Sequence, residues 1–298
     1  MRTIDRAIGR WSGILQALNV DSGILSGKHQ ACPICGNGKD TFRIDLRSEF
    51  GKWYCNYCGG GLGLDFIKGY FRVENREALN MIDKVIGKGI EPVKIERRDP
   101  RPLLRSIWRK LRPASDEVVN YLRSRGLKPL PSIYQATLEY WHDGKSYGEF
   151  ECMVCKIFNI NKEFQSFHIT YLKDGRKADL PVDKKVMSPI DTISGASIQL
   201  MKPNNTLGIA EGIETALSCY EMFDLPMWAS ISANGMEKIE IPESVENIIL
   251  FADNDDSYTG QAAAFNAAKR LQSQGFNVYV QIAYNKDFND DLIKGDSR

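Results

Sequence analysis

The 298-residue sequence contains no apolar run near the roughly 20 residues that a membrane-spanning helix needs. Its first residues, Met1 to Asp5, lack the basic-then-apolar pattern of a secretory signal peptide. Internal repeats and low-complexity tracts are also missing. The stretch SGILSGKH at 22–29 is no phosphate-binding loop, because its spacing is wrong and no Ser or Thr follows Lys28. We therefore expect a cytoplasmic protein without membrane contact and without a motor of its own driven by nucleoside triphosphates.

A net charge near zero conceals an uneven distribution of charge. Residues 1–130 carry 24 Lys and Arg against 14 Asp and Glu, a net of +10. Residues 131–298 carry 15 against 24, a net of −9. A basic first part suits a polyanionic partner, and an acidic second part suits either solubility or cations held by carboxylates. Charge alone does not decide between these uses.

The chain divides into segments of different pattern. Apolar spacing predicts one short helix over 4–18 and another over 75–86. Residues 87–102 contain glycines, prolines and mixed charge without a period, which indicates a linker. Two further helices, broken at Pro113 and ended by Gly126, should precede the short alternating runs of 133–171, which predict antiparallel strands.

The last hundred residues alternate between apolar strands and helices. The strand candidates are TLGIA (206–210), PMWASI (226–231), NIILFA (247–252) and NVYVQIA (277–283), with helices at 214–223 and 260–274. Such alternation predicts a parallel α/β sheet whose strands are covered on both faces. The expected domains are 1–86 (helices and a cysteine-rich ribbon), linker 87–102, a basic α+β part at 103–203 and the parallel-sheet domain at 204–298.

Four of the seven cysteines have the spacing of a zinc site. Cys32 and Cys35 form one CxxC turn, and 19 residues later Cys55 and Cys58 form a second. Two such turns supply four thiolates for one tetrahedral ion, so we predict one structural Zn²⁺ in a zinc ribbon. Cys152 and Cys155 lie within an apolar strand pattern, and we expect them to pack in a core.

The ribbon also carries candidates for nucleic-acid binding. Arg43 and Trp53 lie on its two predicted strands, where a cation could contact phosphate and an aromatic ring could stack on a base. An equally good interpretation of Trp53 is that it fills the small core of the ribbon. The sequence leaves both open.

Acidic residues follow three of the predicted parallel strands. Glu211 follows TLGIA, Asp253 and Asp255 follow NIILFA, and residues 287–291 follow NVYVQIA. The carboxyl ends of parallel strands form the ligand crevice of an open α/β sheet, so these acids should meet in space. Carboxylates of this kind suit Mg²⁺ or Mn²⁺. The alternative is that they are caps and solvated turn residues.

Three of these segments resemble the motifs of the Toprim domain, which bacterial-type primases, type IA and II topoisomerases and some nucleases share. They are EGIETALS (211–218), ADND (252–255) and KDFND (286–290). The cysteine segment CPICGNGKDTFRIDLRSEFGKWYCNYCGGGLGLDFI resembles the zinc ribbon of satellite-phage and plasmid alpha-type primases. FHITYLKDGRKADL and SGASIQL also resemble the segment that precedes Toprim there. The resemblance covers about residues 30–290, and the order of its modules is that of primases.

The resemblance implies a DNA primase that makes short RNA primers on single-stranded DNA, in the replication of a phage, plasmid or other mobile element. On this basis Glu211 would act beside the catalytic metal, and Asp253 and Asp255 would bind Mg²⁺ or Mn²⁺. Asp287 and Asp290 are the looser candidates from the third motif. Lys173, Arg176 and Lys177 would contact template or nucleotide. The run of Lys and Arg from Arg97 to Arg112 has two equal interpretations, a track for phosphate and a solvated linker.

Two other functions stay open at this stage. A Toprim nuclease would use the same metal site to cleave DNA without nucleotides, and an inactive zinc-ribbon adaptor would bind DNA and load another replication protein. A strand-passing topoisomerase would need a tyrosine nucleophile on a further large domain. Because no motor is present, we expect unwinding by a separately encoded helicase. The start sequence, the choice between ribo- and deoxynucleotides and the oligomeric state are not encoded in any recognisable pattern.

Overall fold

The computed structural model describes residues 2–92 and 99–296 of the chain. They form two units, residues 1–98 and residues 99–298, and each is treated by itself below. No helix within the described residues has the length and apolar character needed to cross a bilayer. Residues 93–98, at the centre of the predicted linker 87–102, lie outside the described residues.

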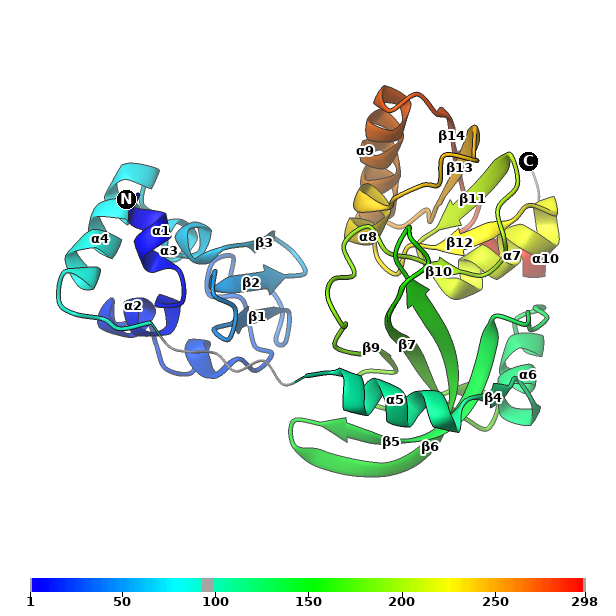
Figure 1. Ribbon diagram of the computed structural model, residues 1–298, viewed down its shortest axis with the longest axis horizontal. Coiled ribbons are helices and arrows are strands. Elements are labelled where there is room, and N and C mark those ends of the chain that lie inside the picture. Colours follow the sequence, from blue (N-terminus) through cyan, green and yellow to red (C-terminus); the bar gives the residue numbers. More distant parts are fainter. Residues whose placement is uncertain (1, 93–98, 297–298) are drawn as a thin grey trace. The chain divides into compact units, whose positions relative to one another are not determined.

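The first unit is a small antiparallel ribbon with helices around it (Figure 1). Its strands pair in the order β1-β2-β3. The elements are α1 (Thr3–Ala7), α2 (Trp11–Ala17), the 3₁₀ helix η1 (Ile24–Ser26), β1 (Phe42–Asp45), β2 (Lys52–Cys55), β3 (Gly59–Gly61), α3 (Gly63–Phe71) and α4 (Asn75–Ile86). The α4 helix matches the prediction for 75–86.

The single helix predicted over residues 4–18 is wrong, because the segment forms two helices. Gly9 separates α1 from α2 and has φ of +72°, a left-handed conformation that a continuous helix does not contain. Its amide donates to the Glu49 carbonyl, so the break ties the helices to the ribbon. The apolar residues Ala7, Trp11 and Ile14 nevertheless face one core, which is why their helical spacing was informative.

The second unit begins with an antiparallel sheet in the order β4-β5-β6-β7-β8, with β9 also paired to β7. Its strands are long and cross-paired along their length, as the alternating pattern of 133–171 predicted. The elements are α5 (Arg101–Lys110), β4 (Arg112–Pro113), α6 (Asp116–Arg123), β5 (Ile133–His142), β6 (Lys145–Phe158), β7 (Phe164–Lys173), β8 (Arg176–Lys177) and β9 (Lys184–Val186). The helix break near Pro113 and the stop at Gly126, with φ of +71°, are confirmed.

A parallel sheet with helices on both faces completes the second unit. The strand order is β10-β12-β11-β13-β14, and only β10 runs antiparallel to its neighbour. The elements are β10 (Ile198–Gln199), β11 (Thr206–Ala210), α7 (Ile213–Phe223), β12 (Met227–Ala229), α8 (Ala233–Lys238), β13 (Asn247–Ala252), α9 (Thr259–Ser273), β14 (Asn277–Ile282) and α10 (Phe288–Lys294). The predicted α/β class, with an N-terminal four-cysteine ribbon and a C-terminal parallel sheet, is confirmed.

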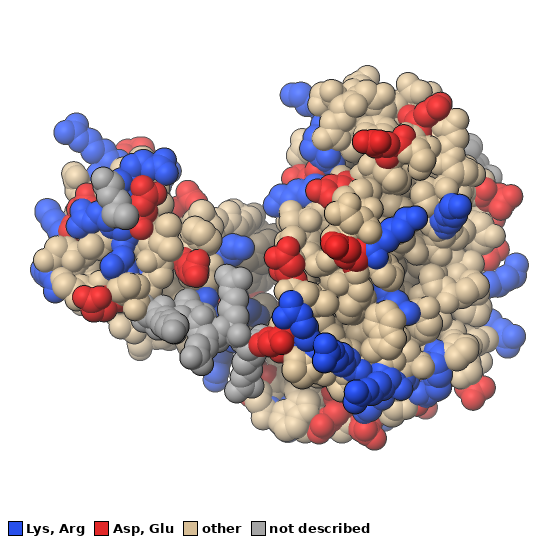
Figure 2. All heavy atoms as spheres, in the orientation of Figure 1, with Lys and Arg blue, Asp and Glu red and all other residues tan. Residues whose placement is uncertain are grey.

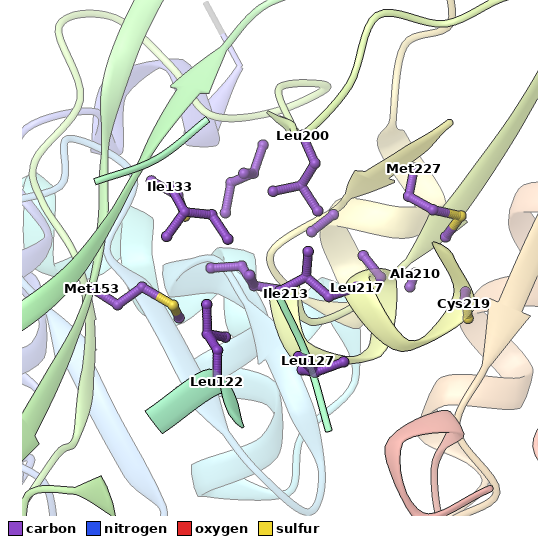
Figure 3. Close-up of a cluster of buried hydrophobic side chains, with 14 of the residues drawn as sticks. Leu122, Leu127, Ile133, Met153, Leu200, Ala210, Ile213, Leu217, Cys219 and Met227 are labelled. Atoms are coloured by element: carbon purple, nitrogen blue, oxygen red, sulfur yellow. The ribbon is translucent and has the colours of Figure 1, made fainter. Parts of the chain in front are cut away.

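One continuous core joins the antiparallel and parallel sheets (Figure 3). Leu122 and Met153 from the antiparallel part pack in the same cluster as Ile213, Leu217 and Met227 from the parallel part. On the opposite face of the parallel sheet, α8 and α9 cover a separate apolar cluster. The predicted parts 103–203 and 204–298 therefore lie in one unit, and the boundary between them remains a prediction.

Candidate active site and zinc site

Four cysteine sulfurs converge at the tip of the ribbon. Their Sγ atoms all lie within 4.8 Å of one another, with 3.6 Å between Cys32 and Cys58 and 3.8 Å between Cys35 and Cys55. A tetrahedron with Zn–S bonds of about 2.3 Å has edges of about 3.8 Å, which matches this spacing. The backbone amide of Tyr57 also donates to Cys55 Sγ at 3.3 Å. The donor set and its geometry fit one structural Zn²⁺.

Trp53 belongs to the core of the ribbon, which corrects its prediction as a nucleic-acid-binding residue. It is 9% exposed, and its ring packs 6.0 Å from Phe42 and 6.3 Å from Phe66, between centroids. Its indole N–H donates to the Leu62 carbonyl at 3.2 Å, so the polar edge of the ring is also paired within the ribbon. A three-stranded sheet this small needs large rings to build any core.

The exposed face of the ribbon carries other candidates for base stacking. Arg43 is exposed and lies directly opposite Tyr54 in the β1–β2 ladder. Tyr54 is 58% exposed and Tyr57 is 66% exposed. The alternation that buries Trp53 therefore places its neighbour Tyr54 beside the predicted cation Arg43. Sequence alternation could have made this distinction, because Phe42, Ile44, Trp53 and Cys55 are the apolar positions of both strands.

The acidic strand ends meet at one edge of the parallel sheet, as predicted. Ala210 of β11 pairs with Phe251 of β13, so Glu211 and Asp253 follow neighbouring central strands at nearly the same level. Asp287 lies after β14, which pairs with β13 on its other side. Glu211, Asp253 and Asp287 all line a cavity of about 330 Å³. This volume is at the lower end of the range for small-molecule sites.

Burial and mutual repulsion raise the pKa of the two central carboxyls. The pKa of Asp253 rises to about 7 because the group is buried and because Asp287, Glu211 and Asp255 are near. The pKa of Glu211 is also raised, first by burial and then by Asp255, although the Ala233 amide and Lys184 oppose the shift. Asp253 Oδ1 is buried without any hydrogen-bond partner among the described residues. A hydrogen bond from Thr215 opposes the rise in pKa, but no salt bridge within the described residues compensates an ionised Asp253.

Asp255 lies in a different environment from Asp253. Burial raises the pKa of its carboxyl, but hydrogen bonds from Ser257 and the amides of Gly260 and Thr259 outweigh this and lower it overall. The Ser257 amide and hydroxyl donate to Asp255 Oδ1 at 2.9 and 2.5 Å. The carboxylate is held ionised at the start of the loop before α9. Asp255 does not line the cavity, but it acts electrostatically on both Glu211 and Asp253.

The residues of the third acidic cluster, 287–291, lie in three different environments. Asp287 lines the cavity and also caps α10, because its Oδ1 accepts from the Asp290 amide at 2.8 Å. Asn289 is buried and is bonded to Arg125 and Ser218, while Asp291 is buried and bonded to the amides of residues 284 and 285. Asp290 is partly exposed and is not among the residues that line the cavity. Of the two predicted ligands here, the structure places Asp287, not Asp290, beside Asp253.

Cations form the opposite wall of the cavity. Arg125, Lys177 and Lys184 line it together with His168. Glu214, at the first turn of α7, accepts from Tyr121 Oη at 2.7 Å and lies 3.6 Å from Lys177 Nζ and 3.5 Å from Lys184 Nζ. Burial alone would raise the pKa of Glu214, but Lys184, Lys177 and Tyr121 lower it to about 2. This acid is therefore a buried anchor for the two lysines.

Sequence patterns identified only part of this wall. Lys177 was predicted with Lys173 and Arg176, and the structure separates them. Lys173 and Arg176 are exposed on the β7–β8 hairpin, whose turn residues Asp174 and Gly175 both have positive φ, whereas Lys177 points to the cavity. Arg125, His168 and Lys184 were missed, because only the pairing of β7 with β9 and the docking of α6 bring them to the acids. No local motif signals these contacts.

Lys and Arg side chains also gather over α5, as Figure 2 shows. Arg105 and Arg109 are exposed at helical spacing there, and Lys156 lies 4.0 Å from the ring centroid of the half-exposed Trp108. Arg101, the first described residue of the predicted basic run, and Arg112, its last, are paired with Asp99 and Glu151, respectively. Arg97 and Arg98 lie outside the described residues.

The acidic wall suits a hard divalent cation. An unpaired buried carboxylate oxygen on Asp253, next to Glu211 and Asp287, is the environment that a cation would neutralise. The acids are less closely gathered than the cysteines, since among the described residues only the four cysteines meet the 4.8 Å spacing. Wider spacing is compatible with Mg²⁺, which keeps several waters and shares phosphate ligands.

Family models match three parts of the chain. The zinc-binding domain of primase-helicase matches residues 27–64, and the Toprim domain matches residues 206–297. A domain family of unknown function, DUF7146, matches residues 98–197. The chain therefore carries a primase-type zinc ribbon and a Toprim domain, as the sequence motifs indicated.

Solved structures of primases show similar arrangements at low identity. The primase fragment of the bacteriophage T7 primase-helicase protein is 18% identical, with 90% of this chain and 95% of that chain covered and a TM-score of 0.42. The zinc-binding and RNA polymerase domains of the Aquifex aeolicus primase are 15% identical, with coverages of 99% and 83% and a TM-score of 0.45. A DNA primase domain from Pseudomonas aeruginosa is 16% identical, with coverages of 67% and 75% and a TM-score of 0.46. Similarity at this level does not decide function.

The zinc site predicts a specific loss of metal. Cys58→Ser should reduce bound zinc from about one ion per chain to a small fraction, because three thiolates leave the tetrahedron incomplete. Unit 1 should also unfold at lower temperature. Atomic absorption and thermal unfolding measure both effects. Cys152→Ala, at a buried cysteine far along the chain, is the matched control and should keep its zinc; equal loss in both variants would contradict the assignment.

The raised pKa of Asp253 predicts that this residue destabilises the protein when Mg²⁺ is absent. The pKa of Asp253 is near 4 in the unfolded chain and about 7 in the folded protein. Between pH 4 and pH 7, the folded state therefore keeps a proton on this carboxyl that the unfolded state has lost. Stability therefore falls as pH rises from 4 through 7. Asp253→Asn removes this effect and should stabilise the protein by about 2 kcal/mol at pH 8, with a smaller gain toward pH 4.

Denaturant unfolding without Mg²⁺ at pH 8 and pH 4.5 measures this difference. Asp256→Asn is the control, because Asp256 is exposed and lies three residues after Asp253. It should change stability little at either pH. A lower stability of Asp253→Asn at pH 8 would contradict the prediction, because it would mean that the folded protein stabilises the ionised carboxylate.

Proposed function

We propose that this chain, which joins a primase-type zinc ribbon to a Toprim domain, is a DNA primase that makes short RNA primers from nucleoside triphosphates on single-stranded DNA. The observation that carries the proposal is the cavity with carboxylates on one wall and cations on the other. A nucleoside triphosphate bound with divalent cations has complementary charge to both walls. The zinc ribbon, as a separate basic module, supplies a surface for the template.

The reaction is nucleotidyl transfer. The 3′-hydroxyl of the primer end or initiating nucleotide attacks the α-phosphate of the incoming triphosphate, and pyrophosphate leaves with the bond between the α- and β-phosphates. Glu211, Asp253 and Asp287 would bind Mg²⁺ or Mn²⁺, and the charge of the nearby Asp255 would add to the attraction. The bound ions would neutralise the phosphates and lower the pKa of the attacking hydroxyl.

The side chains of the cavity have separate tasks in this reaction. Lys177 and Lys184, held in place by Glu214, face the phosphate chain and attract it into the cavity. Arg125 is oriented by Asn289, whose Oδ1 accepts from Arg125 Nη1 at 3.1 Å. A guanidinium fixed in this way can bind two phosphate oxygens at once.

Template binding is assigned to the exposed cations and rings of both units. Arg43, Tyr54 and Tyr57 on the ribbon are arranged for stacking and phosphate contact, and Lys173 and Arg176 extend from the β7–β8 hairpin. The Lys and Arg band over α5 is a further track for the strand. Such surfaces bind single strands with strong salt dependence.

A separately encoded helicase would open the duplex, and the enzyme would serve the replication of a phage, plasmid or other mobile element in the cytoplasm. Primer synthesis on a forked duplex should rise on addition of the helicase from the same replicon. No stimulation by that helicase would count against this part of the proposal.

Loss of the acids should abolish synthesis without unfolding the chain. Glu211→Ala and Asp253→Ala should each lower incorporation of labelled nucleotides on single-stranded DNA by at least about 100-fold, because the metal ions lose their ligands. Asp256→Ala is the control and should retain near-normal activity. Retained synthesis by both variants would refute the assignment, and DNA degradation without nucleotides would instead identify a nuclease.

The ribbon predicts a contrast between two neighbouring aromatic residues. Tyr54→Ala should weaken binding of single-stranded DNA by roughly 5- to 100-fold, in line with the loss of one stacked base, and should leave stability unchanged. Trp53→Ala should destabilise unit 1 by about 3 kcal/mol or more, because a buried ring is removed. Fluorescence anisotropy with labelled DNA and thermal unfolding separate the two effects. Normal DNA binding by the double variant of Tyr54 and Tyr57 would exclude the stacking role.

A further inference from the structure

His168 is a buried side chain in the cavity wall whose ring is not hydrogen-bonded to any other described residue. It is 7% exposed and lies on β7, on the face that turns toward the cavity. Its Nδ1 atom is fully enclosed without a partner, whereas Nε2 is not among the enclosed unpaired atoms. The open nitrogen of the ring is therefore Nε2. Thr170, two residues along the same face of the strand, also has a buried and unpaired hydroxyl.

Unsatisfied buried polar groups are uncommon in folded proteins, and each one needs a reason. A buried N–H without an acceptor is rarer than an acceptor without a donor. The enclosed Nδ1 is for this reason the unprotonated nitrogen, and the proton of the neutral ring lies on Nε2. His168 then presents one N–H donor to the cavity.

The surroundings of the ring identify what that donor meets. Lys184 lies opposite Thr170 in the β7–β9 ladder, and Lys177 lies opposite Leu172 in the β7–β8 ladder. The charged groups that act on the ring are Glu214, Lys184, Lys177 and Asp183. Burial and the two lysines lower the pKa of His168 to about 4, so the ring is a neutral donor near pH 7. It lines the same cavity as these two cations, which attract phosphate.

We propose that His168 binds the incoming nucleotide by donating a hydrogen bond from Nε2 to an oxygen of its phosphate chain. This inference rests on the proposed function, because it names one contact of the nucleotide in the same cavity. Phosphate oxygens only accept hydrogen bonds, so they match a site that offers only an N–H. The contact adds a directional bond to the less directional attraction of Lys177 and Lys184.

The stability of a His168 variant distinguishes a nucleotide-binding role of this residue from a role in packing. An unpaired buried ring contributes no hydrogen bond to the fold, and replacing it with an apolar side chain should be neutral or stabilising. His168→Leu should thus unfold at the same temperature as the original protein or higher. A packing role would instead lower the unfolding temperature in proportion to any loss of nucleotide binding.

The test compares three variants in the full chain. Isothermal titration with an adenosine triphosphate analogue that has a methylene group between the α- and β-phosphates, in Mg²⁺, gives affinity without turnover. His168→Leu should bind about 10- to 100-fold more weakly, as expected for the loss of one bond to a charged acceptor. His168→Gln places an amide N–H near the position of Nε2 and should stay within about 5-fold. His142→Leu, at a histidine outside the cavity lining, should bind normally.

The same variants separate this inference from the proposed function. Weaker binding by His168→Leu, rescue by His168→Gln and unchanged stability support the contact, whether or not the original protein makes primers. Equal binding by His168→Leu and the original protein overturns the contact even if primer synthesis is normal. Equal loss in the Leu and Gln variants, or a lower unfolding temperature, also overturns it. If the original protein binds no triphosphate analogue, both the contact and the primase assignment fail.

Discussion

The buried pairing of Glu214 with Lys177 and Lys184 is the interaction on which the cavity depends. Glu214 belongs to α7 of the parallel sheet, and the lysines belong to strands of the antiparallel sheet. The hydroxyl of Tyr121 from α6 completes the set. Glu214 is 6% exposed, so without both lysines it would be a buried charge with the hydroxyl of Tyr121 as its remaining partner. The set therefore fixes the two sheets at one separation and orients two cations toward the acids.

The shared core makes this arrangement rigid. Ile213 and Leu217 flank Glu214 on α7 and pack against Leu122 and Met153 of the antiparallel part (Figure 3). The helix that carries the ionic anchor thus also carries the apolar contact between the sheets. Neither wall of the cavity can move far without disrupting this packing, because close-packed interiors do not deform continuously. A cavity built from both sheets keeps its charges in place before a ligand arrives, which is the preorganisation that catalysis by electrostatics requires.

The sequence predicted one wall of the cavity well and the other poorly, for a topological reason. Glu211 and Asp253 directly follow apolar runs, and the ends of parallel strands must meet, so their neighbourhood follows from local pattern alone. Lys184 lies in no motif and reaches Glu214 only because β9 pairs with β7. In the ribbon, the spacing of the four cysteines was decisive, and the alternation of apolar residues along both strands contained the information that Trp53 is buried and Tyr54 exposed. The break at Gly9 was missed because helical spacing continues across it.

Two residues that line the cavity carry buried polar atoms without hydrogen-bond partners among the described residues. They are Asp253, through Oδ1, and His168, through Nδ1. Ile231, which lines the cavity, has φ of +76°, a conformation that costs a β-branched residue roughly 1–3 kcal/mol. Its amide donates to the Glu211 carbonyl, so this strained turn fixes the residue that begins the acidic wall.

A fold selected only for stability would remove such features, because each is relieved by a single substitution at its own position. The unpaired oxygen of Asp253 has a physical explanation if a ligand supplies its partner. A divalent cation would compensate Asp253, and phosphate oxygens would meet the open Nε2 of His168 and the lysines. Glu214 shows the contrast, since it is more deeply buried than Asp253 yet paired with two lysines and a tyrosine, and its pKa is about 2 against about 7 for Asp253. The carboxylate that the protein neutralises itself holds the site together, and the carboxylate that it leaves unpaired is the one available to the metal.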